Sequence, residues 1–262
     1  MWKIIPMQRS SERKERSGSR EDSRVNLLKF DEKQVRVKDI YGNTFEGVAD
    51  YFDSCYSFHE YDVDEDMVRI EDFIIWESQI ESIEEIEVHG TAELRTERLK
   101  LRRYRQEDAE ELYKYFGTDP STYQYSGWNP YATPEMTVET IARFLRSYSD
   151  EHCYGWVMDV DDVIVGTIGA YDYKDGCIEV GLTVNKGWRR RGFAAEALQR
   201  VLTYLTENEG ISRVIAWCAS ENTGSAKAME KAGMKLVREE KGSLTVGDRT
   251  YDRLYYEYRK KL

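Results

Sequence analysis

Three adjacent arginines and a glycine, Arg189 to Gly192, carry the most specific chemical signal in this sequence. The apolar run Cys177–Val184 before them predicts a buried strand, and the apolar spacing from Leu198 to Leu205 predicts an amphipathic helix after them. The first N–H groups of a helix lack intrahelical partners and point outward, where they attract an anion. Gly192 also lets the backbone approach a ligand closely. The stretch therefore predicts a binding site for a pyrophosphate.

Glu179 is the one acidic residue within the predicted strand Cys177–Val184. Its neighbours Ile178 and Val180 point to the opposite face, because side chains alternate along a strand. Burial among apolar side chains raises the pKa of a carboxyl toward the range that suits a general base. Such a base would take a proton from an amine, whose ordinary pKa is near ~8–10. The alternative is a carboxylate at the strand edge that is paired with an arginine.

The composition argues against a membrane, secreted or metal-binding protein. Among the 262 residues, no apolar run reaches the ~18–20 residues that cross a bilayer, and the N-terminus lacks the features of a secretory signal. The four cysteines are widely spaced, and three lie in apolar or aromatic runs, so we expect reduced and mostly buried thiols in a cytoplasmic protein. The three histidines show no metal-ligand spacing, so we expect no metal site.

Charge divides the chain into three parts. Residues 1–24 hold seven basic and four acidic side chains, which predicts a disordered, solvated tail; a basic arm that touches RNA or a membrane is the weaker alternative. Residues 25–93 hold five basic and nineteen acidic side chains, whereas residues 94–262 hold twenty-six of each. We therefore expect a small acidic domain over 25–90 and a larger, electrically balanced domain over 94–262.

Short alternating strands are expected throughout the acidic domain. Candidates include Val35–Ile40, Phe45–Tyr51, Met67–Ile70 and Phe73–Trp76, and a fifth lies over 80–86, which together predict a small antiparallel barrel. This strand pattern and its glycines resemble the Sm-like fold, whose members often bind RNA. The net charge of this domain would repel a polyanion, so RNA binding is not expected. We interpret it as a protein-contact or regulatory module, or an appended domain.

Residues 94–262 resemble the GNAT superfamily of N-acetyltransferases. Arg189-x-x-Gly192-x-Ala194 matches its loop for the pyrophosphate of acetyl-coenzyme A (acetyl-CoA). Thr-Glu-Arg-Leu-Lys-Leu-Arg over 96–102, Asn222-x-x-Ser225 and Glu-Lys-Ala-Gly-Met over 230–234 are similar to the RimJ/RimL-like subfamily, which acetylates the N-termini of ribosomal proteins. The resemblance implies an α+β GNAT fold with a mixed sheet, C-terminal to the small all-β Sm-like barrel. Met234 stands where the subfamily usually has phenylalanine, a change that affects packing.

The GNAT resemblance also assigns roles to individual residues. Glu179 would act as the base, directly or through water, and a main-chain N–H near Thr183 and Val184 would bind the oxyanion. Met229 replaces the tyrosine that many members use to protonate the thiolate, so Ser225 is the substitute, and the alternative is no dedicated acid. The residues that the resemblance places on acetyl-CoA are Leu182, Thr183, Val184, Arg189, Arg190, Arg191, Gly192, Phe193, Ala194 and Asn222. Asn222 could equally serve only as a helix N-cap.

The acceptor is the least defined part of the prediction. The aromatic loop over 123–131, with Tyr125 and Trp128, would line the acceptor entrance or pack as core. We expect transfer of acetyl to a primary amine, with a protein N-terminal α-amine ahead of an amino acid, polyamine or antibiotic. The rival from another class is a regulatory or interaction protein whose GNAT domain only binds coenzyme A. A homodimer is compatible with any of these.

Overall fold

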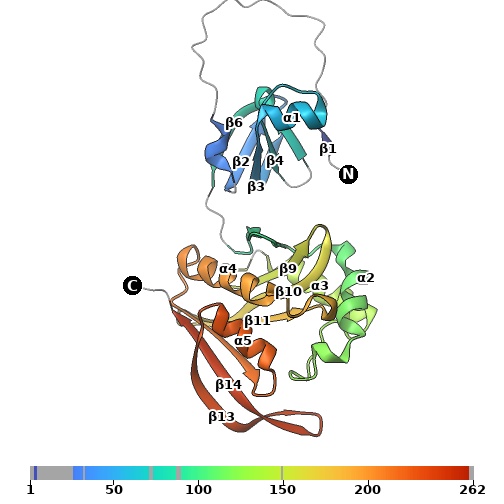
Figure 1. The fold of residues 1–262 in the computed structure, drawn as a ribbon, viewed down its shortest axis with the longest axis vertical. Helices are drawn as coiled ribbons and strands as arrows, with labels where there is room; N and C mark the ends of the chain where they lie inside the picture. The colour runs from blue at the N-terminus through green and yellow to red at the C-terminus, as the bar shows by residue number, and fades with distance from the viewer. Residues whose placement is uncertain are drawn as a thin grey trace, which may run out of the picture. The chain divides into compact units, whose positions relative to one another are not determined.

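A computed structural model of the chain describes residues 3–4, 26–31, 33–70, 73–86, 90–148 and 150–259. The chain forms two compact units, Met1–Val88 and His89–Leu262 (Figure 1). Each unit has its own sheet, and the two are described separately. No helix in the described ranges is both long and apolar enough to span a membrane.

The N-terminal unit is built on a six-stranded sheet with the order β1-β5-β4-β3-β2-β6. Its strands are β1 (Lys3–Ile4), β2 (Gln34–Asp39), β3 (Thr44–Phe52), β4 (Met67–Ile70), β5 (Phe73–Trp76) and β6 (Ile80–Glu85). The first half of β3 pairs with β2 and the second half pairs with β4, so one long strand joins the two parts of the sheet. The five strands expected within 25–90 are all present.

Two elements of this unit differ from the prediction. Helix α1 (Ser54–Tyr61) lies between β3 and β4, where only strands were expected; Asp53 caps it by accepting a hydrogen bond from the N–H of Tyr56 at 2.9 Å. Strand β1 pairs in parallel with β5, so Lys3–Ile4 departs from the wholly disordered tail that the composition predicted. The rest of that expected tail lies outside the described residues. A short 3-10 helix, η1 (Leu27–Phe30), precedes β2.

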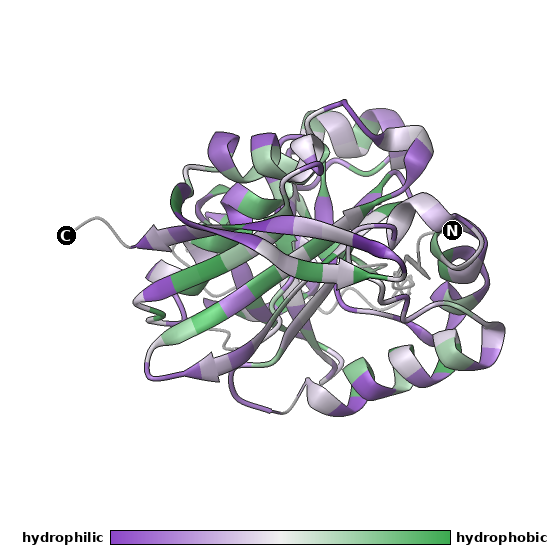
Figure 2. Ribbon diagram, turned by 90° about the horizontal axis from the view of Figure 1, so that it is seen from below, coloured by the Kyte–Doolittle hydropathy of each residue, from purple (hydrophilic) through white to green (hydrophobic). Residues whose placement is uncertain are grey.

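The C-terminal unit contains an eight-stranded sheet with the order β13-β14-β12-β11-β10-β9-β8-β7. Its strands are β7 (Leu94–Arg95), β8 (Lys100–Arg102), β9 (Tyr154–Val160), β10 (Val163–Lys174), β11 (Cys177–Val184), β12 (Arg213–Ala219), β13 (Lys235–Val246) and β14 (Arg249–Arg259). Hydrophobic residues concentrate on the central strands, whereas the helices carry hydrophobic and hydrophilic residues on different faces (Figure 2).

Helices flank this sheet. They are α2 (Ala109–Leu112), which continues as the π-helical η4 (Tyr113–Gly117), then α3 (Pro134–Ser147), α4 (Phe193–Glu207) and α5 (Thr223–Lys231). Short 3-10 turns are η2 (Glu77–Gln79) in the first unit and η3 (Gln106–Asp108), η5 (Pro120–Thr122) and η6 (Lys186–Trp188) in the second. Helix α4 packs on β11 and β12, and α5 packs on β12 and β13.

The sheet opens between β11 and β12, which are its parallel pair. These strands pair only from Cys177 opposite Arg213 to Glu179 opposite Ile215. Beyond that point β11 stays paired with β10 up to Val184, and β12 stays paired with β14 up to Ala219. The two strands therefore part after Glu179, and the last five residues of β11 have one unpaired edge. This opening positions the candidate site.

A hairpin lies at each edge of this sheet. Strands β7 and β8 form one, because the Thr96 N–H donates to the Leu99 carbonyl at 2.9 Å and turns the chain. Strands β13 and β14 form the other. All four cysteines are free thiols, but Cys218 alone is buried, so the expectation of mostly buried cysteines was wrong.

Candidate active site

The unpaired edge of β11 presents backbone donors to the opening. The N–H of Asn185, the residue after β11, donates to the Val165 carbonyl in β10 at 2.8 Å. Since backbone groups alternate in direction along a strand, the N–H groups of Leu182 and Val184 face the other way, toward the opening. The N–H of Thr183 faces β10. Of the two residues expected near an oxyanion, Val184 therefore offers its N–H, and Leu182 offers a second.

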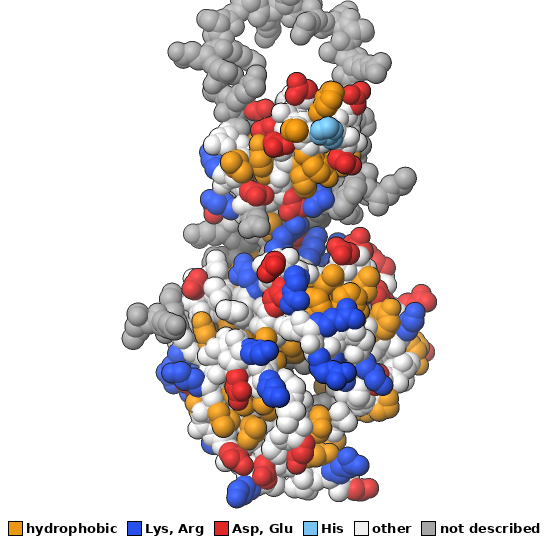
Figure 3. Space-filling model, in the orientation of Figure 1, with side chains coloured by type: hydrophobic (Ala, Val, Ile, Leu, Met, Phe, Trp, Pro, Cys, Tyr) orange, Lys and Arg blue, Asp and Glu red, His pale blue; other side chains and the backbone are white. Residues whose placement is uncertain are grey.

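The loop between β11 and α4 combines positive charge with an uncapped helix start. Arg190 has φ 62° and Gly192 has φ 91°, which is the left-handed region that glycine tolerates best. Gly192 is the N-cap of α4 and supplies no side-chain hydrogen bond to the first N–H groups of the helix. Arg190 and Arg191 are exposed, and the Arg191 guanidinium lies 4.7 Å from the Trp188 ring centroid. Lys and Arg side chains are spread over the visible face of this unit (Figure 3).

Arg189 has a different environment from the next two arginines. Its Nε donates to the carbonyl of Val184 at 2.9 Å, and its Nη1 donates to the Ser121 hydroxyl at 2.8 Å. Its Nη2 lies 3.8 Å from the carboxylate of Asp119. The guanidinium of Arg189 thus ties the end of β11 to the loop around η5. Although the sequence placed Arg189 among the cofactor residues, its side chain is engaged by the protein.

A second arginine, Arg98, contacts both the basic loop and the first turn of α4. Arg98 donates from Nη1 to the Arg191 carbonyl at 3.1 Å and from Nε to the Glu196 carboxylate at 2.8 Å. Its guanidinium also lies 4.5 Å from the ring centroid of buried Phe193. Glu196 further accepts from the Thr96 hydroxyl at 2.6 Å. This role of Arg98 was not predicted from the sequence, although Arg98 lies within the motif 96–102 and Glu196 lies in the helix after the basic loop.

Glu179 lies at the point where β11 and β12 part. Its Oε1 accepts a hydrogen bond from the indole Nε1 of Trp217 at 2.9 Å, and Tyr171 is its cross-strand neighbour on β10. Burial raises the pKa of the Glu179 carboxyl above its usual value, while the hydrogen bonds from Trp217 and Tyr171 act in the opposite direction. The expected alternative was a carboxylate in a salt bridge. Among the described residues Glu179 forms no ion pair within 4 Å.

Asn222 and Ser225 begin helix α5. The side chain of Asn222 accepts a hydrogen bond from the N–H of Ser225 at 3.2 Å, so Asn222 is the N-cap. The Ser225 hydroxyl lies beside the thiol of Cys218, whose pKa burial raises to about 11. Met229, on the same helix, is buried. The described hydrogen bonds bring Asn222 and Ser225 together at the end of β12, and they do not join either residue to Glu179.

Helix η5 and the aromatic loop after it together bridge the ends of the two diverging strands. Ser121 contacts Arg189 after β11, and the Tyr125 hydroxyl donates to the Glu221 carbonyl after β12 at 3.4 Å. Tyr125 also packs edge-on against Tyr251 at 5.6 Å and belongs to a hydrophobic cluster. Trp128 is 60% exposed. The two predicted acceptor residues therefore differ, since Tyr125 packs as part of a core and Trp128 stands in solvent.

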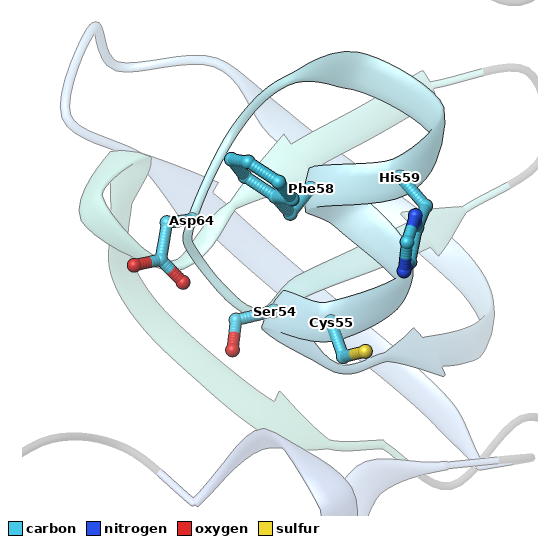
Figure 4. Close-up of a pocket in the computed structure, with 5 residues that line it drawn as sticks. All are labelled: Ser54, Cys55, Phe58, His59 and Asp64. Atoms are coloured by element: carbon cyan, nitrogen blue, oxygen red, sulfur yellow. The ribbon is translucent and has the colours of Figure 1, made fainter.

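A separate hollow lies in the N-terminal unit beside α1. Ser54, Cys55, Phe58, His59 and Asp64 line a cavity of ≈ 360 Å³ (Figure 4). Cys55 and His59 lie one helical turn apart, but His59 and Asp64 lie on opposite sides of Phe58 in this view. Across the residues that the structure describes, no three His, Cys, Asp or Glu side chains converge to hold a metal ion.

These features define a fold in which a parallel strand pair opens beside a basic, uncapped helix. A sequence profile of the acetyltransferase (GNAT) domain matches residues 98–235, which is more than half of the chain. The chain therefore belongs to the GNAT acetyltransferase family, and it is an acetyl-CoA-dependent N-acetyltransferase. This confirms the superfamily predicted from the sequence.

Individual relatives match a little over three fifths of the chain. The N-acetyltransferase YnaD of Bacillus subtilis is 27% identical over 166 residues, which are 62% of this chain and 93% of the relative. A GNAT-family acetyltransferase from Bacillus anthracis is 26% identical, with a TM-score of 0.56 over 63% of this chain and 96% of that one. The structure of the ribosomal L7/L12 alpha-N-protein acetyltransferase RimL in complex with coenzyme A has a TM-score of 0.58 at 15% identity. The match covers 63% of this chain and 95% of RimL. At this identity the likeness shows a common fold and nothing more.

Proposed function

We propose that the opening between β11 and β12 is the site where this enzyme transfers acetyl from acetyl-CoA to a protein N-terminal α-amine. The observation that carries the proposal is the placement of Glu179. This partly buried carboxylate, which forms no ion pair among the described residues, lies at the last paired position before the strands part. A raised pKa at the base of an opening is characteristic of a catalytic base.

The residues around the opening suit acetyl-CoA, which supplies the acetyl group as a thioester. The uncapped first turn of α4 and the exposed Arg190 and Arg191 would hold the pyrophosphate, because backbone N–H groups and cations both favour an anion. The N–H groups of Leu182 and Val184 would bind the pantetheine arm and the acetyl oxygen. The loop would be positioned by Arg189, Phe193 and Ala194. The side chain of Arg189 would fix it through its hydrogen bonds to Val184 and Ser121.

The chemistry assigned to the chain is the movement of two protons. Glu179 accepts one from the acceptor amine, directly or through water, as the amine nitrogen bonds to the acetyl carbon. The Val184 N–H donates to the acetyl oxygen while negative charge develops there. The carbon–sulfur bond then breaks, and the departing thiolate takes a proton from the Ser225 hydroxyl, which takes one from water in the same step. The alternative is direct protonation of the thiolate by water.

A protein N-terminus is the acceptor we favour over a small amine. Trp128 is exposed on the loop that bridges the two strand ends, where an extended peptide would pass. The fold shared with RimL agrees with such an acceptor, but folds host many substrates, so this likeness adds little. In the same proposal the N-terminal unit, an acidic Sm-like module, contacts protein rather than RNA.

Replacement of Glu179 by glutamine tests the base. We expect Glu179→Gln to lower kcat by about 100-fold or more, the usual contribution of a general base, with acetyl-CoA affinity nearly unchanged. Thiol release measures turnover and calorimetry measures binding. Glu207→Gln is the matched control, because Glu207 is exposed at the end of α4. An unchanged rate in Glu179→Gln would remove Glu179 as the base, and tight binding without turnover on any amine would favour a regulatory protein.

A further inference from the structure

Glu179 shares one face of the sheet with a row of aromatic and basic side chains. Glu179 is paired with Ile215 on β12, and Trp217 lies two residues further along the same strand. Trp217 is paired with Tyr255 on β14, two residues from Arg253. Because directly paired residues and alternate residues of a strand point to the same face, Glu179, Trp217, Tyr255 and Arg253 all project from it.

Contacts join these side chains into one series. The Trp217 indole donates to Glu179 at 2.9 Å, and the Arg253 guanidinium lies 4.6 Å from the centroid of the same indole ring. Arg253 also lies 5.9 Å from the ring of Tyr255, over which Arg238 packs at 3.9 Å. The positive charge of Arg253 is therefore separated from the proposed base by one indole ring.

Arg253 differs from the other arginines of this face in how its charge is used. Arg238 pairs with Glu240, and Arg213 lies 3.6 Å from Glu257. Arg253 forms no ion pair among the described residues, and its Nε is buried without a hydrogen-bond partner there. Its terminal nitrogens make only long contacts of 3.4 Å, to the Tyr255 hydroxyl and the Ser243 carbonyl. Arg253 as a whole is only partly buried, and terminal guanidinium nitrogens whose contacts are this long have donors left for an anion.

We infer that Arg253 binds a carboxylate of the acceptor, so that the enzyme selects amines that carry a negative charge close to the amino group. The inference rests on the proposed role of Glu179 as the base. Glu179 would accept the amine proton while Arg253 binds the carboxylate, and the indole of Trp217 lies between these two side chains. The same arrangement disfavours polyamines, because Arg253 repels a second ammonium group. The carboxylate is either an acidic side chain near a protein N-terminus or the α-carboxylate of a free amino acid.

Acetyl transfer to matched acceptors tests this inference in the full-length enzyme. One pair of peptides differs only in aspartate against asparagine at the second position, and the other pair is free serine against serine amide. We expect the charged member of one pair to be favoured about 10- to 100-fold in kcat/KM, the range of a charge-assisted hydrogen bond. The favoured pair identifies the source of the carboxylate. Equal kcat/KM within both pairs would overturn the inference.

Variants then separate a role in recognition from a role in folding. Arg253→Met should abolish the preference for the charged acceptor by raising its KM, whereas Arg253→Lys should retain part of it. Arg238→Met is the matched control and should keep the preference, because Arg238 already has Glu240 as its partner. A merely structural Arg253 would lower kcat/KM equally for both members of a pair, and that result would contradict the inference.

Calorimetry keeps this inference distinct from the proposed function. The four acceptors are titrated into enzyme saturated with coenzyme A, where binding is measured without chemistry. If turnover is absent but Arg253 still discriminates the charged acceptor, the proposed base fails and the recognition by Arg253 stands. If turnover depends on Glu179 but no acceptor pair is discriminated in binding or in rate, the proposed function stands and the role of Arg253 is wrong.

Discussion

The two strands that part at the candidate site are each followed by a helix, and the two helices begin in different ways. After β12, α5 starts at Asn222, whose side chain accepts a hydrogen bond from the N–H of Ser225. After β11, α4 starts at Gly192, which has no side chain to offer. Helices α1 and α3 resemble α5, since Asp53 and Thr133 cap them.

The difference is whether the first N–H groups of the helix are bonded by an N-cap side chain or left open to a ligand. A capped start satisfies its own donors and contributes stability, whereas an open start leaves N–H groups for an outside anion. The open start of α4 also has exposed Arg190 and Arg191 beside it, and Arg98 holds it in place. This comparison supports the proposal that the start of α4 binds the cofactor phosphates, whereas Asn222 at the start of α5 serves the fold as an N-cap.

The largest effect should follow from closing the open start with a negative charge. We expect Gly192→Glu to reduce acetyl-CoA affinity at least 100-fold, because its carboxylate would occupy the anion site and repel phosphate. Calorimetry with acetyl-CoA measures this loss. Gly192→Ala is the control for backbone strain, since its φ of 91° disfavours any side chain and the added Cβ would lie 3.3 Å from Arg98. Equal losses in the two variants would show that strain, and not charge, is responsible.

The next effect concerns the hydrogen bond that crosses between the two strands. Trp217→Phe keeps the ring but removes the donor to Glu179, and a donor to a carboxylate favours its charged form. Burial already holds the pKa of Glu179 above its usual value, so losing the donor should raise this pKa further. The acidic limb of the pH profile of kcat/KM should therefore move to higher pH, with activity retained at alkaline pH. A uniform loss at every pH would indicate a packing role only.

A smaller effect should come from the support of the open helix start. Glu196→Gln weakens the hydrogen bonds from Thr96 and Arg98, which should lower the free energy of unfolding by about 1–3 kcal/mol at neutral pH. The pKa of Glu196 is lowered: burial acts to raise it, but these bonds outweigh that effect. Its contribution is thus present above the ordinary carboxyl pKa and is lost as the pH falls through the folded-state value. Denaturant unfolding at neutral and acidic pH should show the difference between variant and parent disappearing in acid.

The smallest effect is expected at the capped start. Asn222→Ala should lower the free energy of unfolding by about 1 kcal/mol, the usual value of an N-cap, with little change in acetyl-CoA affinity. Asn222→Asp is the matched control, because aspartate caps equally well. A loss of affinity in Asn222→Ala much larger than the loss of stability would show that Asn222 also contacts the cofactor, as the subfamily resemblance implies.

The sequence was sufficient for the elements with strong local patterns. The alternation and apolar run of β11, the glycine at the start of α4 and the Asn-x-x-Ser start of α5 all specify local structure, and each is observed. The five strands of the acidic unit were predicted for the same reason. Helix α1 was missed because its residues include β-favouring aromatic side chains, while its N-cap, Asp53, is one of many acidic residues nearby.

Contacts between distant segments could not be predicted in this way. Arg189 reaches Ser121 across 68 positions of the chain, and Arg98 reaches Glu196 across 98. The hydrogen bond from Trp217 to Glu179 likewise depends on how β11 and β12 are paired, which the apolar pattern of each strand leaves open. A sequence motif thus predicts where a site lies, but the hydrogen-bond partners of its side chains are set by how the strands pair in the folded sheet.

The most direct test of the central claim is calorimetry of acetyl-CoA binding to the parent protein, Gly192→Glu and Glu179→Gln, followed by thiol release with amine acceptors. We expect the parent and Glu179→Gln to bind acetyl-CoA with similar affinity, Gly192→Glu to bind it at least 100-fold more weakly, and kcat to fall by about 100-fold or more in Glu179→Gln. Binding of acetyl-CoA by Gly192→Glu with the affinity of the parent would contradict the assignment of the cofactor to the open start of α4.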